Sequence, residues 1–481
     1  MSFSEFIAAT PLIILAALPV FLTALLAFVR DYRIMAIGTA GGLGVSLAAV
    51  IVLAGGKPMT VTPLIVMDGY SHLFIVLIVT SGIVATLLSF HYSTGPEPIR
   101  EEYYLLISLA VLGGAVVAAA RHFASFFLGL EILGLSFYTL IAFKRDEPSP
   151  LEAGIKYLIP AAVSDAFILF GTALLYGVTG RLEIGGLFAA VTDGANVQAL
   201  CGYAMLSVGI GFKLSFVPFH MWTPDVYEGA TAPVTALLAT VSKVAVFAFL
   251  LRLFTGLDLN SLGGIVAFLS VVAAASMFFG NLAALLQHNV KRILAYSSIG
   301  HVGYMLTAFL TGEPGSHAAV AFYLTAYTVT TLGAFGVIAA LSQSDREADS
   351  IEDYRGLARR RPFLAAIFIA MLLSLAGIPL TAGFIGKFYV MAAGIRTGLL
   401  VLVVCLIVTS VISVYYYLRI VVIMFDQDHE ATSELRGSVS PSRASNAVLA
   451  VLLLLLVWLG VTPSLCIRVI ESIVNTGGPP V

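Results

Sequence analysis

Three stretches of the chain are apolar and free of charge over lengths that are typical of membrane helices. Residues 34–56, 397–418 and 445–467 contain no Asp, Glu, Lys or Arg. A helix that crosses the hydrocarbon core of a bilayer needs about 20 mainly apolar residues. The runs are continuously apolar and do not alternate, which argues against a transmembrane β-barrel. The sequence therefore predicts an all-α polytopic membrane protein.

The composition excludes several other classes of protein. Of the 481 residues, 59% are hydrophobic and 11% are charged, whereas a soluble domain carries about 25% charged residues. Such a chain cannot cover the surfaces of a cytosolic enzyme, and it is too apolar to be disordered. A net charge of −2 provides no basic surface for nucleic acid. The three cysteines form no CxxC pair, so neither a disulfide framework nor a metal site is expected.

Fourteen segments are long and apolar enough to be spans, and no polar connection between them is long enough to form a soluble domain. The predicted spans lie near residues 8–28, 34–56, 70–90, 103–120, 122–143, 152–177, 198–218, 231–254, 260–284, 291–310, 316–341, 362–395, 397–424 and 446–470.

Basic residues in the connections fall unevenly on the two sides of the membrane. One side receives Arg30, Arg33, Arg100, Lys144, Arg145, Lys291, Arg292, Arg346, Arg355, Arg359, Arg360, Arg361, Arg436 and Arg443. The other side receives Lys57, Arg121, Arg181, Arg252, Arg396 and Arg468. Because the more basic side faces the cytoplasm, both termini are expected on the outer side.

Two spans contain strong helix breakers close to a lysine. In FKLSFVPFHMW, Lys213 lies five residues before Pro218, and in LSLAGIPLTAGFIGKFYV, Pro379 lies eight residues before Lys387. Proline removes a backbone donor and interrupts a helix. Although kinks are common in membrane helices, interrupted helices at matching places in two halves of a chain indicate a transport site. We therefore expect an N-terminal segment (1–102), two five-helix repeats (103–254 and 260–424) and a C-terminal helix (425–481).

Six Asp, Glu and Lys residues lie inside the predicted spans beyond the end residues, and Arg419 near a span end is expected to extend to the interface. An ionised side chain at the bilayer centre costs roughly 2.5–3.5 kcal/mol on the insertion scale, so such residues are expected to face a polar interior. They are Glu131, Lys156, Asp165, Lys213, Lys243 and Lys387. Lys156 lies near the start of its span and can alternatively extend to the interface.

Pairing would offset the cost of burying these charges. Glu131 and Lys213 are a plausible pair across two helices. Lys156 and Asp165 are nine residues apart on one helix, which places them on opposite faces. Asp165 is equally well explained as a local polar contact or as part of a relay.

The pattern of buried charges favours proton transfer over hydrolysis. Burial disfavours the charged form of a lysine and a nearby carboxylate favours it, so such lysines can gain and release protons. His301 lies ten residues into a span and can bridge the two halves, although a purely structural histidine is as plausible. His220 lies just past Pro218 and is a second possible relay.

Four long motifs resemble the antiporter-like membrane subunits of respiratory complex I, the NADH-quinone oxidoreductase. They are FKLSFVPFHMWTPDVYEGATAPVTALLATVSK (212–243), NVKRILAYSSIGHVGYML (289–306), YRGLARRRP (354–362) and LSLAGIPLTAGFIGKFYV (373–390). Fourteen spans fit the bacterial form of this family over nearly the whole chain. The N-type subunits match best, because M-type subunits carry a glutamate in place of Lys387 and L-type subunits have a long C-terminal extension.

The resemblance implies a role for each of the buried charges. Glu131 matches the glutamate of span five, which tunes the lysine of span seven, here Lys213. Lys156 matches an additional lysine of span six, and Lys243 matches the connecting lysine of span eight. Lys387 matches the lysine of span twelve on the outlet side. The family has two inverted five-helix repeats with broken helices at spans seven and twelve. Asp165 matches no landmark of the family.

The resemblance also implies partners and cofactors. The chain would lie in the bacterial inner membrane beside an M-type antiporter-like subunit and small subunits such as K and J. It would hold no cofactor itself, because NADH, FMN, iron–sulfur clusters and quinone would bind to other subunits. The absence from the sequence of cysteine clusters and of a dinucleotide-binding glycine motif agrees with that.

Three functions remain open at this level. The first is a subunit that moves protons when quinone is reduced elsewhere in the complex. The second is a subunit of a cation/proton antiporter, which shares the architecture and works without redox chemistry. The third is a scaffold in which the lysines are structural.

Overall fold

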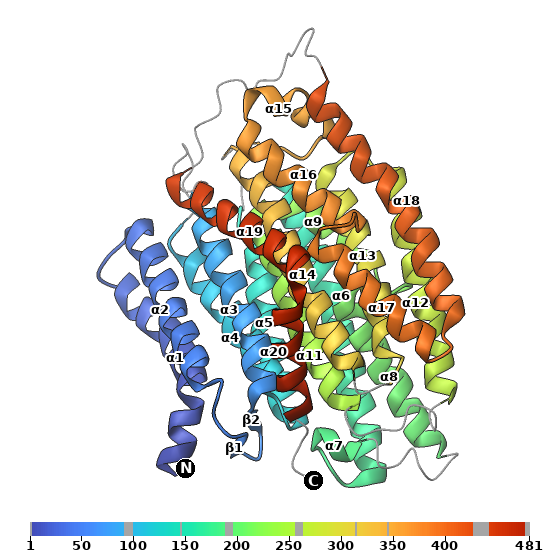
Figure 1. Ribbon diagram of the computed structural model, residues 1–481. Coiled ribbons are helices and arrows are strands. Elements are labelled where there is room, and N and C mark those ends of the chain that lie inside the picture. Colours follow the sequence, from blue (N-terminus) through green and yellow to red (C-terminus); the bar gives the residue numbers. More distant parts are fainter. Residues whose placement is uncertain are drawn as a thin grey trace.

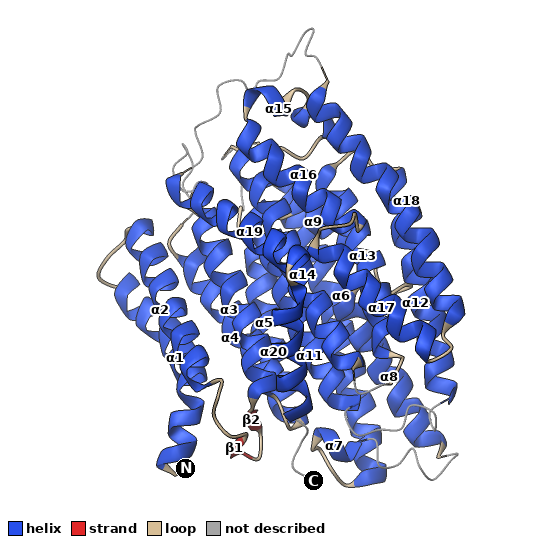
Figure 2. Ribbon diagram, viewed as in Figure 1, coloured by secondary structure: helices blue, strands red, loops and turns tan. Residues whose placement is uncertain are grey.

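The protein is a bundle of long helices in the computed structural model, which describes residues 2–90, 100–144, 147–187, 196–254, 263–312, 315–343, 346–426 and 442–476 (Figures 1 and 2). Apart from one two-stranded hairpin, the regular structure described is helical. This confirms the all-α prediction. Some residues used in the predictions lie outside the described part of the chain. They are Arg145 and Arg436, which were assigned to the more basic side of the membrane, the start of the span predicted at 260–284, and part of the segment predicted at 425–481.

The first half of the bundle runs from the N-terminus to a helix with a π turn. Its helices are α1 (Phe3–Leu26), α2 (Tyr32–Leu53), α3 (Gly69–Ser89), α4 (Glu102–Ala119), α5 (Phe123–Ile141), α6 (Pro148–Thr179), α7 (Ile184–Leu187), α8 (Val197–Leu214), α9 (Trp222–Gly229), α10 (Ala232–Leu237) and α11 (Lys243–Phe254). The π turn Leu238–Ser242 joins α10 to α11. The hairpin of β1 (Met59–Thr62) and β2 (Ile65–Met67) lies between α2 and α3.

The second half also consists mainly of long helices and includes a short acidic 3₁₀ turn and a short helix that contains two arginines. Its helices are α12 (Gly263–Leu285), α13 (Val290–Phe309), α14 (Ser316–Leu341), the 3₁₀ turn Ile351–Tyr354, α15 (Leu357–Arg360), α16 (Pro362–Ala376), α17 (Ala382–Arg396), α18 (Leu400–Phe425), α19 (Arg443–Val461) and α20 (Pro463–Thr476).

Twelve helices among the described residues are long and apolar enough to cross a membrane. Two of the fourteen predicted spans are absent from that set for physical reasons. The segment predicted at 291–310 is the more polar α13, and the segment predicted at 362–395 is divided into α16 and α17. The chain is therefore a multi-pass membrane protein.

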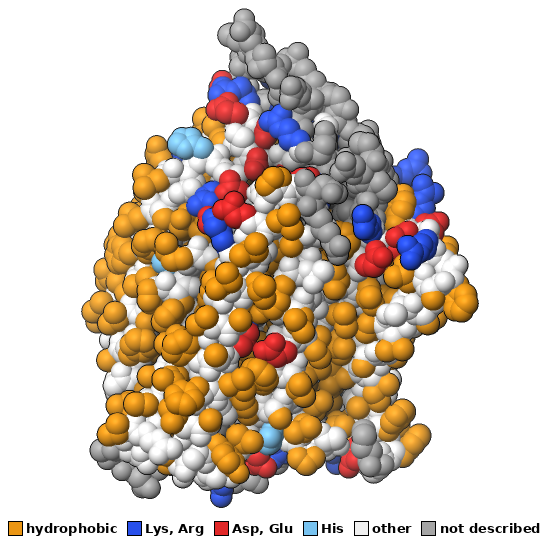
Figure 3. Space-filling view, turned by 180° about the vertical axis from the view of Figure 1, so that it is seen from behind, with side chains coloured by type: hydrophobic (Ala, Val, Ile, Leu, Met, Phe, Trp, Pro, Cys, Tyr) orange, Lys and Arg blue, Asp and Glu red, His pale blue; other side chains and the backbone are white. Residues whose placement is uncertain are grey.

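Side chains are sorted along the bundle by polarity. Hydrophobic side chains cover most of the visible flank, and Lys and Arg gather mainly near one end (Figure 3). The start of α1 and the end of α20 both lie near the opposite end, beside the β-hairpin (Figure 1). This is the distribution expected of a protein that crosses the membrane an even number of times.

A buried ion pair fastens α3 to α11 at the start of α3. Arg252 donates from both Nη atoms to the carboxylate of Asp68, at 3.1 Å each, and Asp68 also caps α3 through the backbone of Ser71. Burial alone would raise the pKa of Asp68, but Arg252 and the Ser71 hydrogen bonds outweigh it and hold the pKa below its ordinary value. The carboxylate therefore stays ionised at neutral pH.

Candidate functional site

Lys213 and Asp165 form an ion pair in the interior of the bundle. Lys213 is in the last turn of α8, and its Nζ lies 2.7 Å from Oδ1 of Asp165 on α6. Both side chains are buried, with exposed fractions of 5% and 9%. Opposite charges at this distance offset much of the cost of removing each from water. The pair therefore gives Lys213 a charged partner in the interior of the bundle.

The predicted contact between Glu131 and Lys213 is replaced by the contact between Asp165 and Lys213. Glu131 lies on α5, is only partly buried, and interacts electrostatically with both Asp165 and Lys213. The carboxylate that reaches the Lys213 ammonium belongs to Asp165, because α6 packs directly against α8. Glu131 is thus a neighbour of the pair, and its tuning role stays a prediction.

Close packing between α6 and α8 explains why Asp165 reaches Lys213. A Cβ atom on Gly209 would lie 2.8 Å from the Ser164 carbonyl oxygen, and one on Gly171 would lie 2.7 Å from the Gly202 carbonyl oxygen. Ser164 also donates to the carbonyl of Gly209 at 3.0 Å. Glycine at these positions lets the two backbones approach, so a short acidic side chain spans the gap.

The helix ends at the first break with its freed groups satisfied locally. Ser215 adopts a left-handed conformation with φ of 64°, and its hydroxyl accepts from Thr223 at 2.9 Å. The indole of Trp222 donates to the Phe212 carbonyl at 3.2 Å. Interrupted backbone is tolerated at membrane depth only where such partners or a polar interior exist. The break immediately follows Lys213, as the sequence predicted.

Lys243 is buried at the point where the π turn ends. Its Nζ donates to Oγ of Ser298 at 2.7 Å and lies 5.6 Å from the centre of the Tyr327 ring. A π turn inside a helix is often found at a functional site, because it changes the direction of the following side chain. Lys243 has hydroxyl and aromatic neighbours and, unlike Lys213, no carboxylate within ion-pair distance among the residues described.

His301 lies between Lys243 and Lys387. Its Nδ1 shares a hydrogen bond of 2.7 Å with the hydroxyl of Tyr323, and the ring interacts electrostatically with both lysines. Tyr304 and Tyr327 pack against the same imidazole. His301 is therefore a close neighbour of both lysines, and its role as a relay stays a prediction.

Lys387 occupies the second break. Its Nζ donates to the carbonyl of Ala376 at 2.9 Å and lies 5.1 Å from the centre of the Tyr304 ring. Ala376 is the last residue of α16, so this carbonyl has no partner within the helix. Gly377 follows with φ of 84°, and a Cβ atom there would lie 2.8 Å from Cδ of Lys387. The break thus supplies both the acceptor and the space for this lysine.

We expect Gly383→Ala to disturb the packing of α17 against α16 at the second break. A Cβ atom on Gly383 would lie 1.9 Å from the Ser374 carbonyl oxygen, and the Gly383 amide donates to the Ser374 hydroxyl at 3.1 Å. Overpacking of this kind costs about 1–3 kcal/mol or more. The amount of assembled complex on native gels should fall. Gly44→Ala is the control, since no atom lies within 4 Å of its Cβ position; equal assembly of both variants would contradict the expectation.

Lys156 lies outside the buried interior. Its Nζ contacts Oδ2 of Asp225 at 2.8 Å and Oε1 of Glu152 at 2.7 Å, and 45% of its side chain is exposed. Asp225 also binds Arg292 at 2.8 Å. As predicted from their spacing, Lys156 and Asp165 face different partners. The role of Lys156 in proton transfer stays a prediction.

His220 is buried beside the first break. Its ring packs edge-on against Phe279 with 4.3 Å between the ring centres. It lies in the turn between α8 and α9, seven residues after Lys213. Its role as a relay also stays a prediction.

Several hydroxyl side chains of the site could not be recognised from the sequence. Ser298, Tyr304, Tyr323 and Tyr327 contact Lys243, His301 or Lys387. The available signal was the density of Tyr and Thr in α14, which is unusual for a lipid-facing helix and typical of a polar interior. We call Asp165, Lys213, Lys243, His301 and Lys387 the buried polar row.

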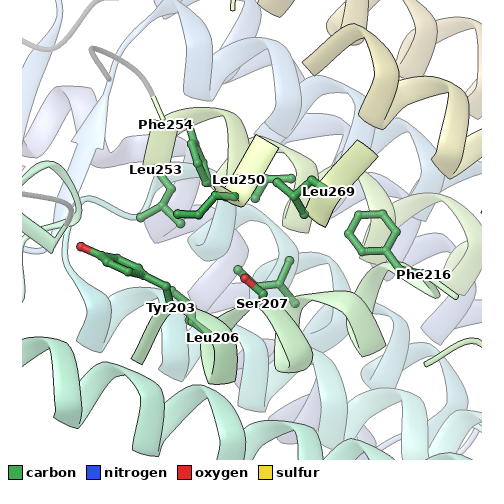
Figure 4. Close-up of a pocket in the computed structure, with 10 residues that line it drawn as sticks. Tyr203, Leu206, Ser207, Phe216, Leu250, Leu253, Phe254 and Leu269 are labelled. Carbon is green, nitrogen blue, oxygen red and sulfur yellow. The ribbon is translucent and has the colours of Figure 1, made fainter. Parts of the chain in front are cut away.

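A pocket between α8, α11 and α12 differs from the buried polar row because its lining is mainly apolar. It has a cavity volume of about 30 Å³, and its described lining is apolar apart from Tyr203 and Ser207 (Figure 4). Apolar cavities do not hold stable chains of water. The pocket is therefore unsuited to proton transfer. Among the described residues, no three His, Cys, Asp or Glu side chains are grouped to hold a metal ion.

Comparison with known proteins agrees with this geometry. Residues 120–413 match the family described as NADH:quinone oxidoreductase/Mrp antiporter, TM. NADH-quinone oxidoreductase subunit N of Nitrosospira multiformis is 46% identical over 486 residues, covering 97% of this chain and 96% of that protein. The protein of the same name from Ectopseudomonas mendocina is 41% identical over 474 residues, covering 95% and 96%.

Solved structures give the same result. A chain of respiratory complex I from Thermus thermophilus with bound aureothin is 35% identical, with a TM-score of 0.81, covering 95% of this chain and 98% of that one. A chain of the Mrp complex from Dietzia sp. is 21% identical with a TM-score of 0.85, covering 99% and 98%, and shows the same fold. The chain therefore belongs to the NADH:quinone oxidoreductase/Mrp antiporter family of membrane subunits, within the group named NADH-quinone oxidoreductase subunit N.

Proposed function

We propose that this chain is a proton-translocating subunit in the membrane arm of an NADH-quinone oxidoreductase. It couples quinone reduction elsewhere in the complex to proton transfer along the buried polar row. The observation that carries the proposal is the pair of buried lysines at two broken helices, Lys213 with Asp165 and Lys387 with the Ala376 carbonyl. Buried, partnered charges beside interrupted helices are typical of ion pathways.

The contacts of each lysine support a stepwise transfer of protons. Asp165 stabilises the protonated form of Lys213, so release from Lys213 requires that this contact weaken or that another charge approach. Among the residues described, Lys243 has no carboxylate within ion-pair distance and donates to the Ser298 hydroxyl, which supports it as a separate site along the path. His301 and Tyr323 lie between Lys243 and Lys387, and both can accept and donate.

The second break explains how Lys387 can release its proton. A backbone carbonyl accepts a hydrogen bond from either the charged or the neutral amine, so it holds Lys387 in place without fixing its charge. We propose Lys387 as the group nearest the outlet. Glu131 tunes Lys213 from the partly buried surface of α5, and His220 is a relay at the first break.

Location and partners follow from the family and from the distribution of charge. We propose a bacterial inner membrane, with the arginine-rich end in the cytoplasm and both termini in the periplasm. The proposed neighbours are an M-type antiporter-like subunit and small subunits such as K and J. NADH, FMN, iron–sulfur clusters and quinone bind to other subunits of the complex.

The alternative is a subunit of a cation/proton antiporter. The likeness to the Mrp chain supports a shared fold. The higher identity to subunit N proteins over nearly the whole chain favours the redox-coupled function.

Co-purification tests the proposed function. A tagged chain should be extracted from its native membranes in mild detergent and isolated with its partners. We expect NADH:quinone oxidoreductase activity that is sensitive to complex I inhibitors in a large assembly. Isolation with small membrane subunits alone, without redox activity and with sodium/proton exchange in vesicles, would instead establish the antiporter function.

A further inference from the structure

The helix α6 supports both pieces of the first broken span. It is continuous for 32 residues, whereas its neighbour is divided into α8 and α9 (Figure 1). Before the break, the close contact of Gly209 with Ser164 brings α8 against α6. After the break, a Cβ atom on Gly229 would lie 2.5 Å from Cβ of Ala153 and 3.0 Å from the Ser149 carbonyl oxygen. The continuous helix α6 therefore packs against α8 before the break and against α9 after it.

One ion pair joins α6 to each piece. Asp165 of α6 binds Lys213 of α8 at 2.7 Å, and Lys156 of α6 binds Asp225 of α9 at 2.8 Å. The charges are reversed between the two pairs, since α6 supplies the acid to one and the base to the other. Seven residues, 215–221, separate α8 from α9 and belong to neither helix. The two pairs therefore bridge the break from a common support.

Asp225 is the centre of a larger network that includes a third helix. Its Oδ2 accepts from Lys156, while its Oδ1 accepts from Nη1 of Arg292 on α13 at 2.8 Å. Arg292 also binds Glu228 of α9 at 2.6 Å. Each oxygen of one carboxylate is thus held by a cation from a different helix. This arrangement fixes α9 between α6 and α13.

We propose that Lys156 and Asp225 are positioning residues, which clamp α9 to α6 so that Lys213 is held in contact with Asp165. In this role Lys156 keeps its charge and transfers no proton. The proposal rests on the proposed function, because the contact that it protects belongs to the proton path. It explains why a lysine with 45% of its side chain exposed has two carboxylate partners.

The physical basis is the short connection between Lys213 and the clamped helix. Residues 215–221 form a turn rather than a continuous helix, so a shift of α9 can be passed through this turn to Lys213 at the end of α8. Without the clamp, α9 keeps its packing against Ala153 and its contact with Arg292, so the helix can remain folded. Its register against α6 is then less restricted, and the contact of Lys213 with Asp165 weakens.

The Lys156→Arg variant distinguishes a positioning role of Lys156 from a role in proton transfer. Arginine can bind Asp225 and Glu152, but it does not release its proton in proteins. In the complete complex in native membrane vesicles, Lys156→Ala should lower NADH-driven proton pumping by about fivefold, within the range for residues that act through another group. Lys156→Arg should restore most of the pumping. Equal loss in both variants would overturn the proposal.

Asp225→Asn provides a second and independent test. It removes the charge that Lys156 binds and should reduce pumping as Lys156→Ala does, while the amount of assembled complex stays similar. Adding Lys156→Ala to Asp225→Asn should cause no further loss, because both substitutions break the same contact. Additive losses would show that Lys156 acts elsewhere and would overturn the proposal.

Two reference variants distinguish a failure of the clamp proposal from a failure of the proposed function. Lys144→Ala removes an ion-paired lysine in the connection between α5 and α6, where its partner is Glu147 of the same connection, and should pump normally. Lys213→Ala removes a member of the buried polar row. If Lys213→Ala also pumps normally, the proposed function fails. If it does not pump and Lys156→Arg fails with it, only the clamp is wrong.

Discussion

Replacing Lys213 by alanine should reduce NADH-driven proton pumping to background while the complex still assembles. A positioned proton-transfer group contributes about 10²-fold or more to the rate of its step. Lys213 is buried at the first break and contacts Asp165, so no described neighbour can take its place at that point. Pumping should be measured in sealed vesicles with a pH-sensitive dye, after NADH is added.

Assembly and coupling must be separated in this experiment. The NADH dehydrogenase activity of the peripheral subunits, measured with an artificial electron acceptor, reports the amount of assembled complex. It should be unchanged in Lys213→Ala. Normal pumping in a stable Lys213→Ala complex would exclude this lysine from the proton path and favour the scaffold function.

Asp165→Asn should have an effect nearly as large, although from its sequence position Asp165 is equally well explained as a local polar contact or as part of a relay. Removing one partner of a buried ion pair costs roughly 3–5 kcal/mol, because the remaining charge is uncompensated. Lys213 has an exposed fraction of only 5% and loses its carboxylate partner. Its charged form is then disfavoured, and the step that loads it with a proton should fail. The dye assay described above measures the loss.

Asp165→Glu and Glu131→Gln are the matched controls. Asp165→Glu keeps the charge and should retain part of the pumping, since the close packing of α6 and α8 limits the fit of a longer side chain. Glu131→Gln leaves the Asp165 contact in place and should be less damaging than Asp165→Asn. A larger loss of pumping in Glu131→Gln than in Asp165→Asn would show that Glu131 is the carboxylate on which Lys213 depends.

The fold followed from the sequence because hydrophobic length is a strong signal. Each span predicted from an apolar run corresponds to a helix or to a broken pair of helices. The breaks at Pro218 and Pro379 were also predictable, since proline and the nearby glycines leave few alternatives. The division into two five-helix repeats stays a prediction, because the segments share little sequence beyond the prolines.

The choice of partner for Lys213 was not predictable, because it depends on packing between helices. Spacing correctly placed Lys156 and Asp165 on different faces of one helix, but it could not show which face meets α8. The contact is decided by Gly202 and Gly209, where the two backbones approach. Glu131 was the expected partner because opposite charges on two helices can offset each other's burial and because the family resemblance assigns it to Lys213.

The hydroxyl groups of the buried polar row were missed for a similar reason. Tyr and Thr carry no charge, so the free energy of placing them in a membrane helix is smaller than for lysine. Their presence in a span is therefore a weaker indication of function. Tyr323 and Tyr327 become significant only when α14 is seen beside His301 and Lys243. Sequence patterns thus identify the charged members of such a row better than the groups that connect them.

We propose that protons move through the buried lysines of this chain in step with quinone reduction. Purified complex in liposomes, either wild type or Lys243→Met, tests it with NADH, a soluble quinone, a pH dye and labelled sodium. We expect NADH to acidify the interior of wild-type liposomes without sodium uptake, and Lys243→Met to abolish the acidification. Sodium uptake by the wild type, or full acidification by Lys243→Met, would contradict the claim.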